Sequence, residues 1–317
     1  MKTIELINAA IAAPSSHNTQ PWQFRLADKA IELWADRTRA LPVNDPYDRE
    51  LTISCGAALL NLRVASAARG MAVATRLEHD HPDHLANVCL DEGEVEAALA
   101  GLETAISERF STREAFLDHE LPDTLPAELD AAIGREGARL HQVGDEDRSV
   151  LAELVAEGDR IQFSNASWRR ELASWMHPGR DRDGLAMSPW VAPISRLVVR
   201  NFDMGNKVGQ ADEDLALNAP ALVVISTADE SQSSWLAAGQ ALERALLLAA
   251  SAGVHAGYLN QPCQVEQLRG QLADRVCPGQ FPQVMLRLGF AEAPAHRAPR
   301  REVKDVLLTY QDLLTQM

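Results

Sequence analysis

The alternation of apolar and polar positions along the chain predicts an α+β protein. Helical spacing of apolar residues predicts helices over 3–13, 47–69, 94–107, 124–134, 146–177, 232–252 and 264–273. Alternating or β-branched apolar runs predict strands over 73–79, 86–92, 219–227 and 283–292, and a hairpin over 23–36 that turns at Ala27, Asp28 and Lys29. In each half of the chain, long helices precede the strands of a mainly antiparallel sheet.

Two long apolar helices resemble each other. The stretch ISCGAALLNLRVASAARG (53–70) resembles LAAGQALERALLLAASAG (236–253), and glycines stand 14 residues apart in both (70 − 56 and 253 − 239). We expect Gly56 and Gly239 to open the helices, and Gly70 and Gly253 to end them at the C-cap position that requires a positive φ. Alanine-rich faces suit close packing of the two helices.

A second similarity suggests that the halves are duplicated. ELINAAIA (5–12) resembles ELDAAIG (128–134), and each lies upstream of one long helix. The separation is 51 residues in the first half (56 − 5) and 111 in the second (239 − 128). We therefore divide the chain into halves 1–93 and 94–317, with a lid-like insertion at about 158–218 that holds three of the six tryptophans.

Composition narrows the class of protein. The 317 residues are 46% hydrophobic, enough for a substantial core, and the formal net charge of −15 argues against nucleic acid or an anionic membrane as partner. Four cysteines without CxxC spacing indicate reduced, buried thiols. No uninterrupted apolar run approaches the roughly 18 residues that span a bilayer, so we expect a cytoplasmic protein.

The most unusual short stretch is PSSHNTQPW (14–22). Its prolines and small polar side chains favour turns, yet it lies between an apolar helical run and an apolar strand. The hydroxyl, amide and imidazole groups of such a rigidly held loop suit the edge of a planar heteroaromatic ring.

Two basic clusters stand out in this acidic chain. RFSTR (109–113) places two guanidiniums and two hydroxyls at a helix end, where they can surround a phosphate, although Glu108 and Glu114 also permit a solvated surface turn. HRAPRREV (296–303) supplies further arginines directly after the last predicted strand.

Other chemistries are less well supported. A serine hydrolase is disfavoured because Ser15 or Ser16 and His17 are near neighbours in the chain and no GxSxG motif occurs. HDHPDH (79–84) is interpreted as a solvated turn rather than a metal site. Neither GxGxxG nor a P-loop is present, which disfavours a Rossmann domain and a P-loop NTPase.

Taken together, APSSHNTQPW, RxSxR, the paired helices and the terminal PRR resemble the FMN-dependent nitroreductase superfamily. The resemblance is greatest to its Acg-type branch, in which two nitroreductase-like halves share one chain. It implies a nitroreductase-like fold, here an internally duplicated pseudo-dimer, that holds FMN between the halves.

The resemblance also implies which residues bind the cofactor. Only the first half has the polar loop and only the second has RFSTR, which implies one FMN per chain. The implied set is Pro14, Ser15, Ser16, His17, Asn18 and Gln20 at the ring, Arg109, Ser111, Thr112 and Arg113 with Arg300 or Arg301 at the phosphate, and Gly257 with Tyr258 near the flavin N5.

The function implied is transfer of hydride from NAD(P)H through FMN to a nitro or quinone acceptor, with no obligatory catalytic side chain and no metal. The alternative is an FMN-sequestering or flavin-sensing protein whose flavin is covered by the lid. The expected partner is a small-molecule electron acceptor. Because the duplicated chain already contains the interface of an ordinary dimer, both a monomer and a homodimer are open.

Overall fold

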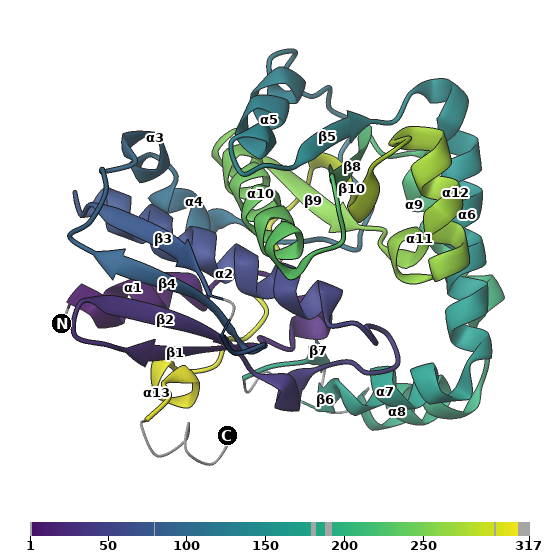
Figure 1. The fold of residues 1–317 in the computed structure, drawn as a ribbon. Coiled ribbons are helices and arrows are strands. Elements are labelled where there is room, and N and C mark those ends of the chain that lie inside the picture. The colour runs from purple at the N-terminus through teal and green to yellow at the C-terminus, as the bar shows by residue number, and fades with distance from the viewer. Residues whose placement is uncertain (1, 79, 179–181, 188–191, 295, 310–317) are drawn as a thin grey trace.

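Two four-stranded sheets and the two long helices between them form the body of the protein (Figure 1). The structure, a computed structural model of the full chain, describes residues 2–78, 80–178, 182–187, 192–294 and 296–309. All strand pairings within the two large sheets are antiparallel, so the predicted α+β class is confirmed.

The first sheet is built by the N-terminal part of the chain. Its strands are β1 (Trp22–Leu26), β2 (Ala30–Ala35), β3 (Val73–Leu77) and β4 (His84–Leu90), in the order β1-β2-β4-β3. The predicted hairpin is confirmed, since β1 pairs with β2 and the amide of Ala27 donates to the carbonyl of Ala30 at 2.9 Å. The helices α1 (Lys2–Ala10) and α2 (Arg49–Ala68) contribute to one hydrophobic core with this sheet.

The second sheet is buried on both faces. Its strands are β5 (Arg139–Gln142), β8 (Ala221–Thr227), β9 (Val254–Tyr258) and β10 (Phe281–Phe290), in the order β5-β8-β10-β9. Alternate residues of β8 enter different cores: Val223 packs with α5 (Leu125–Gly134) and α10 (Gln232–Ser251), whereas Val224 packs with α6 (Asp145–Ser164) and α12 (Glu266–Val276). Sequence analysis did not predict β5 and β9, which are short and contain His, Arg, Gln or Gly.

The two halves share one order of elements. The first runs α1-β1-β2-α2-β3-β4, and the second runs α5-β5-β8-α10-β9-β10 with additional segments between. Corresponding strands also take corresponding places in the two sheets. Both central helices are 20 residues long.

The central helices α2 and α10 touch at two glycines. A Cβ on Gly56 would lie 2.2 Å from the carbonyl oxygen of Leu236, and one on Gly239 would lie 1.9 Å from that of Ile53. The expectation that these glycines open their helices is wrong: each lies seven residues after the first residue of its helix (56 − 49 and 239 − 232), where only hydrogen fits. The predicted positive φ is confirmed at Gly70 (65°) and Gly253 (73°).

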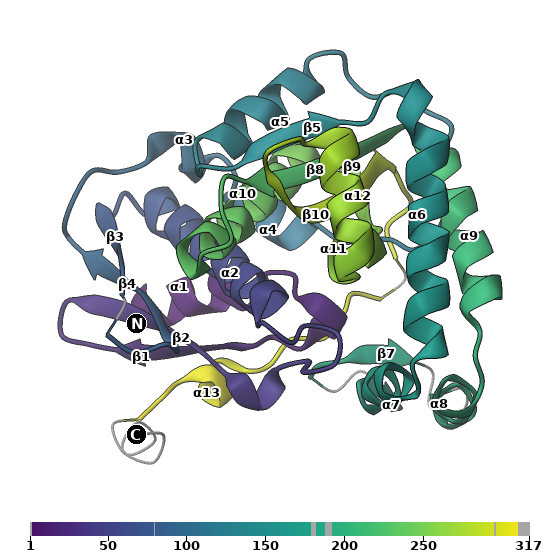
Figure 2. The same ribbon diagram turned by 45° about the vertical axis from the view of Figure 1, so that its right-hand side comes forward.

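A long segment separates β5 from β8 and runs along one side of the molecule (Figure 2). It contains α6, α7 (Ala166–Ser174), β6 (Met176–Pro178), β7 (Leu185–Met187), α8 (Ala192–Asn201) and α9 (Gly205–Leu217). The expected single helix over 146–177 is wrong, because extended backbone at Asn165 ends α6 and its side chain caps α7 by accepting from the amides of Ser167 and Trp168.

Two other predicted helices are also interrupted. The stretch 94–107 forms α3 (Ala97–Ala100) and α4 (Glu103–Glu108), separated at Gly101 and Leu102. The stretch 264–273 falls across α11 (Gln261–Gln264) and α12, because Val265 is extended. Two 3₁₀ turns, η1 (Ser16–Asn18) and η2 (Arg37–Arg39), lie in the loops of the first half.

The end of the described chain returns to the first sheet. After β10 it passes through α13 (Val303–Val306), and the amide of Leu308 donates to the carbonyl of Phe24 at 2.8 Å. Residues of the second predicted half therefore pack on the first half. This return brings the arginines of 297–301 beside the loop that starts at Pro14.

The helix α2 is long and apolar enough to span a bilayer by composition alone, but 89% of its apolar window is buried inside the protein. It packs against α10 and the first sheet, which is the environment of a core helix. The four cysteines are free and buried, as the sequence predicts. Burial raises the pKa of the Cys55 and Cys263 thiols, which keeps them protonated and unreactive.

Candidate functional site

The polar loop that begins at Pro14 is held in an unusual backbone conformation. His17, Asn18 and Gln20 all have left-handed φ angles, of 49°, 54° and 52°. Such angles cost energy for residues other than glycine and persist only where the surroundings fix them. Here the Ser15 hydroxyl accepts from the amide of Gln20 at 2.9 Å. The loop is thus rigid, as its position between two apolar elements suggests.

Asn18 and Gln20 join three distant parts of the chain. The Asn18 amide nitrogen donates to the carbonyls of Gly184 (3.2 Å) and Pro299 (3.1 Å). The Gln20 amide nitrogen donates to the carbonyl of Arg182 at 2.7 Å, and its oxygen accepts from the backbone amide of Arg301 at 2.8 Å. These two side chains therefore hold the loop against the segment 158–218 and the C-terminal return.

Arg109 and Arg300 converge on this loop. Each donates from Nη2 to the carbonyl oxygen of Ala12, at 2.9 and 3.1 Å respectively. Arg109 is buried, and Arg300 also donates to the Asn18 side-chain oxygen at 3.2 Å. Burial, followed by the neighbouring Arg109 guanidinium, lowers the pKa of Arg300 to about 10. Two cations thus share one neutral acceptor.

Several buried polar atoms around these arginines lack a hydrogen-bond partner in the described part of the chain. They include Nε of Arg109, Nε of Arg300, the Tyr258 hydroxyl and Nδ1 of His17. Burial lowers the pKa of His17 to about 4, so its imidazole is neutral near pH 7. Since buried polar atoms in folded proteins nearly always have partners, this cluster has the character of a ligand site.

The other predicted residues of the second half lie along β9. Ser111 pairs with Ala256 as an isolated parallel bridge, and the amide of Thr112 donates to the carbonyl of Ala256 at 2.9 Å. Ser111 and Arg113 are exposed. The RFSTR stretch is therefore attached to the strand that carries Gly257 and Tyr258.

Gly257 has a packing role in this arrangement. A Cβ at this position would lie 2.6 Å from Nε of Arg287, whose side chain crosses over it and donates to the carbonyl of Thr112 at 3.0 Å. Glycine is required there so that a buried arginine can pass, which the expectation of close approach to a flavin did not foresee.

Arg301 differs from its neighbour Arg300. Its guanidinium is buried and donates to the carbonyl of Gln20 (3.0 Å) and to the Asp36 carboxylate (3.2 Å). Gln20 is itself fully buried. The structure therefore places Arg300, and not Arg301, beside Arg109.

A buried carboxylate, which no local sequence pattern predicted, lies under the loop. Glu50, on α2, accepts from the Ser16 hydroxyl at 2.7 Å and from the Gln264 amide at 2.9 Å, with Asn260 at 3.3 Å. It thereby connects the loop of the first half to the end of β9. The sequence signal was a charged pair, Arg49 and Glu50, at the start of an otherwise apolar helix.

A second missed cluster lies where α6 and α9 meet the chain after β9. The Gln261 amide nitrogen donates to the Asp212 carboxylate at 2.7 Å and lies 3.2 Å from that of Asp159. Burial, followed by the neighbouring Asp212, raises the pKa of Asp159 to about 7, and burial raises that of Asp212 as well. Gly158 and Gly209 allow the close approach, since a Cβ on either would lie under 3.0 Å from Gln261 or Ala156.

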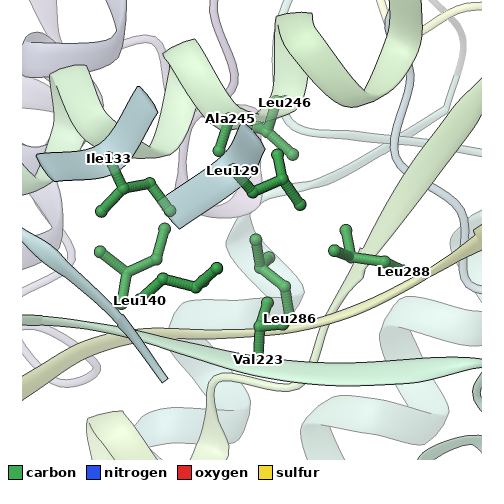
Figure 3. A pocket seen from close by; sticks show the side chains of 9 residues that line it. Leu129, Ile133, Leu140, Val223, Ala245, Leu246, Leu286 and Leu288 are labelled. Atoms are coloured by element: carbon green, nitrogen blue, oxygen red, sulfur yellow. The ribbon is translucent and has the colours of Figure 1, made fainter. Parts of the chain in front are cut away.

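A small cavity lies elsewhere, in the core of the second half (Figure 3). It has a volume of about 10 Å³ and is enclosed by apolar side chains of α5, β5, β8, α10 and β10, including Leu129, Leu246 and Leu286. With no polar group to orient a ligand, it is a packing gap.

The histidine-rich turn packs on an aromatic ring. The rings of His84 and His81 lie 4.4 and 5.4 Å from that of Trp34, while His79 lies outside the described residues. No group of three or more His, Cys, Asp or Glu side chains suited to a metal occurs among the residues that the structure describes.

Known proteins similar to this chain match almost its whole length. "Putative NAD(P)H nitroreductase Rv3131" of Mycobacterium tuberculosis is 29% identical over 320 residues, 98% of this chain and 92% of that one. "Putative NAD(P)H nitroreductase acg" of the same organism is 28% identical over 325 residues, 96% of each chain. "Probable NAD(P)H nitroreductase PigM" of a Serratia species is 24% identical over 332 residues, 96% of this chain and 92% of that one.

No protein-family model matches the chain. Among solved structures, the "FMN and NADPH-dependent nitroreductase NfnB from sphigopyxis sp. strain HMH" is 17% identical with a TM-score of 0.44, and the match covers 66% of this chain and 98% of that one. The full-length similarities, which include acg itself, agree with the resemblance carried by the polar loop and RFSTR. Over almost its whole length the chain is thus similar to proteins named as NAD(P)H nitroreductases, acg among them.

Proposed function

We propose that this chain binds one FMN and acts as an NAD(P)H-dependent oxidoreductase on nitro or quinone compounds. The observation that carries the proposal is the convergence of Arg109 and Arg300 on the Ala12 carbonyl oxygen. A phosphate fits this place, because its oxygens satisfy guanidinium donors and its charge offsets the repulsion between the two arginines. The names of the full-length relatives support the same activity.

The unpartnered polar atoms support a ligand with several oxygens. Nε of Arg109, Nε of Arg300 and the Tyr258 hydroxyl can all donate, and none makes a hydrogen bond within the described part of the chain, although Nε of Arg109 lies 3.4 Å from the Glu243 carboxyl group. Tyr258 also lies near the exposed Ser111. In this proposal Arg109, Arg300 and Ser111 hold the phosphate, and Tyr258 donates to it or to a neighbouring hydroxyl.

The polar loop orients the ring system. Ser15, Ser16, Asn18 and Gln20 use their side chains to fix the loop, so in this proposal Pro14 and the neutral His17 are the members whose side chains border the ligand. FMN, when bound, supplies the hydride and electron chemistry. The chain then has to bind, orient and shield, and no acid or base side chain is needed for the transfer itself.

One site per chain follows from the unequal halves. The shared order of elements and the paired glycines of α2 and α10 support an internal duplication with halves at 1–93 and 94–317. The arginines at 109 and 300 meet the polar loop of the first half. The second half has no PSSHN stretch to build a matching site.

Purified full-length protein saturated with FMN tests the proposal. We expect one FMN per chain, bound more tightly than riboflavin, and steady oxidation of NADH or NADPH when a quinone or nitroaromatic compound is supplied. Absence of flavin binding would refute the whole proposal, whereas binding without turnover on a broad panel of acceptors would refute the enzymatic part.

A flavin-sequestering or flavin-sensing role is the second candidate, and the segment 158–218 favours it. Arg182 and Gly184 of this segment contact the polar loop, and Arg39 beside the loop pairs with Asp183. A segment fastened this closely can act as a lid that excludes nicotinamide. This candidate predicts that dithionite reduces the bound FMN while NADH and NADPH do not, and rapid reduction by either nucleotide would rule it out.

A further inference from the structure

The carboxyl group of Glu243 occupies an unusual position at the centre of the molecule. Glu243 lies on α10 with 0% of its side chain exposed, and its Oε1 is 3.4 Å from Nε of Arg109. Neither carboxyl oxygen has a hydrogen-bond partner in the described part of the chain. Burying an ionised carboxylate without hydrogen-bond donors is unfavourable in free energy. The neutral acid is therefore favoured unless a cation, here Arg109, is free to pair with the carboxylate.

The groups around Glu243 come from four other parts of the chain. Arg109 follows α4, Asn61 lies on α2, Tyr258 lies on β9, and Arg300 comes from the C-terminal return. The Asn61 amide lies near the carboxyl group without completing a hydrogen bond. Among the residues that the structure describes, Arg109 and Arg300 are the charged groups that act on Glu243, and both are the cations assigned above to the phosphate.

We propose that Glu243 competes with the flavin phosphate for Arg109 and Arg300, so that phosphate binding is accompanied by uptake of one proton on Glu243. With the phosphate bound, Glu243 is a neutral acid beneath the arginines; with the phosphate absent, it ionises and pairs with Arg109. Glu243 is then a positioning residue that makes the affinity for a phosphorylated flavin dependent on pH. The inference rests on the proposed function, since it requires a phosphate at this place.

The direction of the pH effect follows from the charges. Burial raises the pKa of Glu243 to about 7 even though Arg109 opposes that change, and a phosphate anion nearby would raise it further. Binding therefore takes up a proton above pH 7, and the dissociation constant of FMN rises by up to about tenfold per pH unit there. Ionisation of the phosphate itself, with a pKa of about 6, would instead strengthen binding to arginine as pH rises. The two explanations predict opposite slopes.

The test measures the affinity of the full-length apoprotein for FMN and for riboflavin between pH 6 and 9. Binding is detected by the quenching of flavin fluorescence. For the wild type we expect FMN affinity to fall above pH 7 while riboflavin affinity stays constant. For Glu243→Gln, which keeps the shape and removes the charge, we expect no such fall, and FMN binding about tenfold tighter than wild type at pH 8. Glu103→Gln, on the exposed side of α4, is the matched control and keeps the wild-type slope.

An equal slope in wild type and Glu243→Gln would overturn the inference, as would weaker FMN binding by the variant at every pH. If the wild type binds FMN at no pH, the proposed function itself is wrong. Should Glu243→Gln not fold, calorimetry of wild-type FMN binding at pH 8, in buffers of different ionisation enthalpy, decides the matter. Uptake of close to one proton supports the inference, and uptake near zero contradicts it.

Discussion

Arg109 and Arg300 donate to the same carbonyl oxygen, that of Ala12, although 191 residues separate them (300 − 109). Two cations do not gather at one buried neutral acceptor for stability, because burial and then the repulsion by Arg109 disfavour the charged form of Arg300 and lower its pKa. We propose that a bound anion joins them whenever the Glu243 carboxyl group beside Arg109 is neutral. In the proposed site the first arginine follows α4, and the second reaches the loop only through the C-terminal return.

Replacing Arg300 with glutamine tests this explanation. Glutamine can still donate to the Ala12 carbonyl but brings no charge to a phosphate. A hydrogen bond to a charged group contributes about 1.5–3 kcal/mol, so FMN affinity should fall roughly 10- to 100-fold. Riboflavin, which has no phosphate, should bind Arg300→Gln and wild type alike in equilibrium titrations. An equal loss for both flavins would mean that Arg300 acts through the fold.

The adjacent residue should behave differently. Arg301 pairs with the buried Asp36 and holds the carbonyl of Gln20. Removing one partner of a buried ion pair costs about 3–5 kcal/mol, so Arg301→Gln should lower the free energy of unfolding strongly in urea titrations. The fraction of Arg301→Gln that remains folded should retain the wild-type preference for FMN over riboflavin. Lys304→Gln, at an exposed position of α13, is the control and should leave stability nearly unchanged.

The contrast between these arginines shows what sequence analysis could provide. PSSHNTQPW, RFSTR and the terminal arginines are local patterns, and they identified the segments that the structure brings together. Which arginine of PRR faces Arg109 depends on how the C-terminal return crosses the loop, and no local pattern contains that. Glu50, Glu243 and Gln261 were missed for the same reason, since the contacts that Glu50 makes with Ser16, Glu243 with Arg109 and Gln261 with Asp212 join residues more than thirty positions apart.

The elements themselves were predicted best where one signal dominated. The long apolar runs of α2 and α10 and the positive φ at Gly70 and Gly253 were clear. Breaks inside helical patterns were not predicted. Asn165 interrupts the stretch 146–177 because its side chain caps a new helix, and a sequence that can cap a new helix can also continue the old one. The contact between Gly56 and Gly239 was likewise not predicted, because it depends on how α2 and α10 pack against each other.

The contact between α2 and α10 leads to a prediction about stability. Gly239→Ala would place a methyl group 1.9 Å from the carbonyl oxygen of Ile53, so the two helices must separate. Overpacking of this kind costs about 1–3 kcal/mol or more. Gly270→Ala, in α12, has no atom within 4 Å of the added group and should be neutral or stabilising by up to about 1 kcal/mol. Thermal unfolding of both variants checks the pair, and equal behaviour would contradict the close packing.

The paired carboxyl groups of Asp159 and Asp212 predict how stability depends on pH. The pKa of Asp159 is raised to about 7 in the folded protein, first by burial and then by Asp212, compared with about 3.9 in an unfolded chain. Folding therefore favours the protonated acid. The stability that this proton provides is complete below about pH 4 and is lost as pH rises through about 7, by an amount on the order of 4 kcal/mol. Nearby arginines make this loss smaller, because they favour the ionised carboxylates and so lower the pKa values. They are Arg160 near Asp159, and Arg113 and Arg287 near Asp212.

Asp159→Asn tests this argument, because an amide has no proton to lose and can still bond to Asp212. Its free energy of unfolding relative to wild type should increase between pH 5 and pH 8, measured by urea titration at both values. Asp214→Asn, at an exposed position of the same helix as Asp212, should show no such change. If the variant and the wild type differ by the same amount at both pH values, the two carboxyl groups do not share a proton. An increase seen only for Asp159→Asn would mean that the attachment of α9 to α6, and with it the segment next to the polar loop, weakens as the solution becomes alkaline.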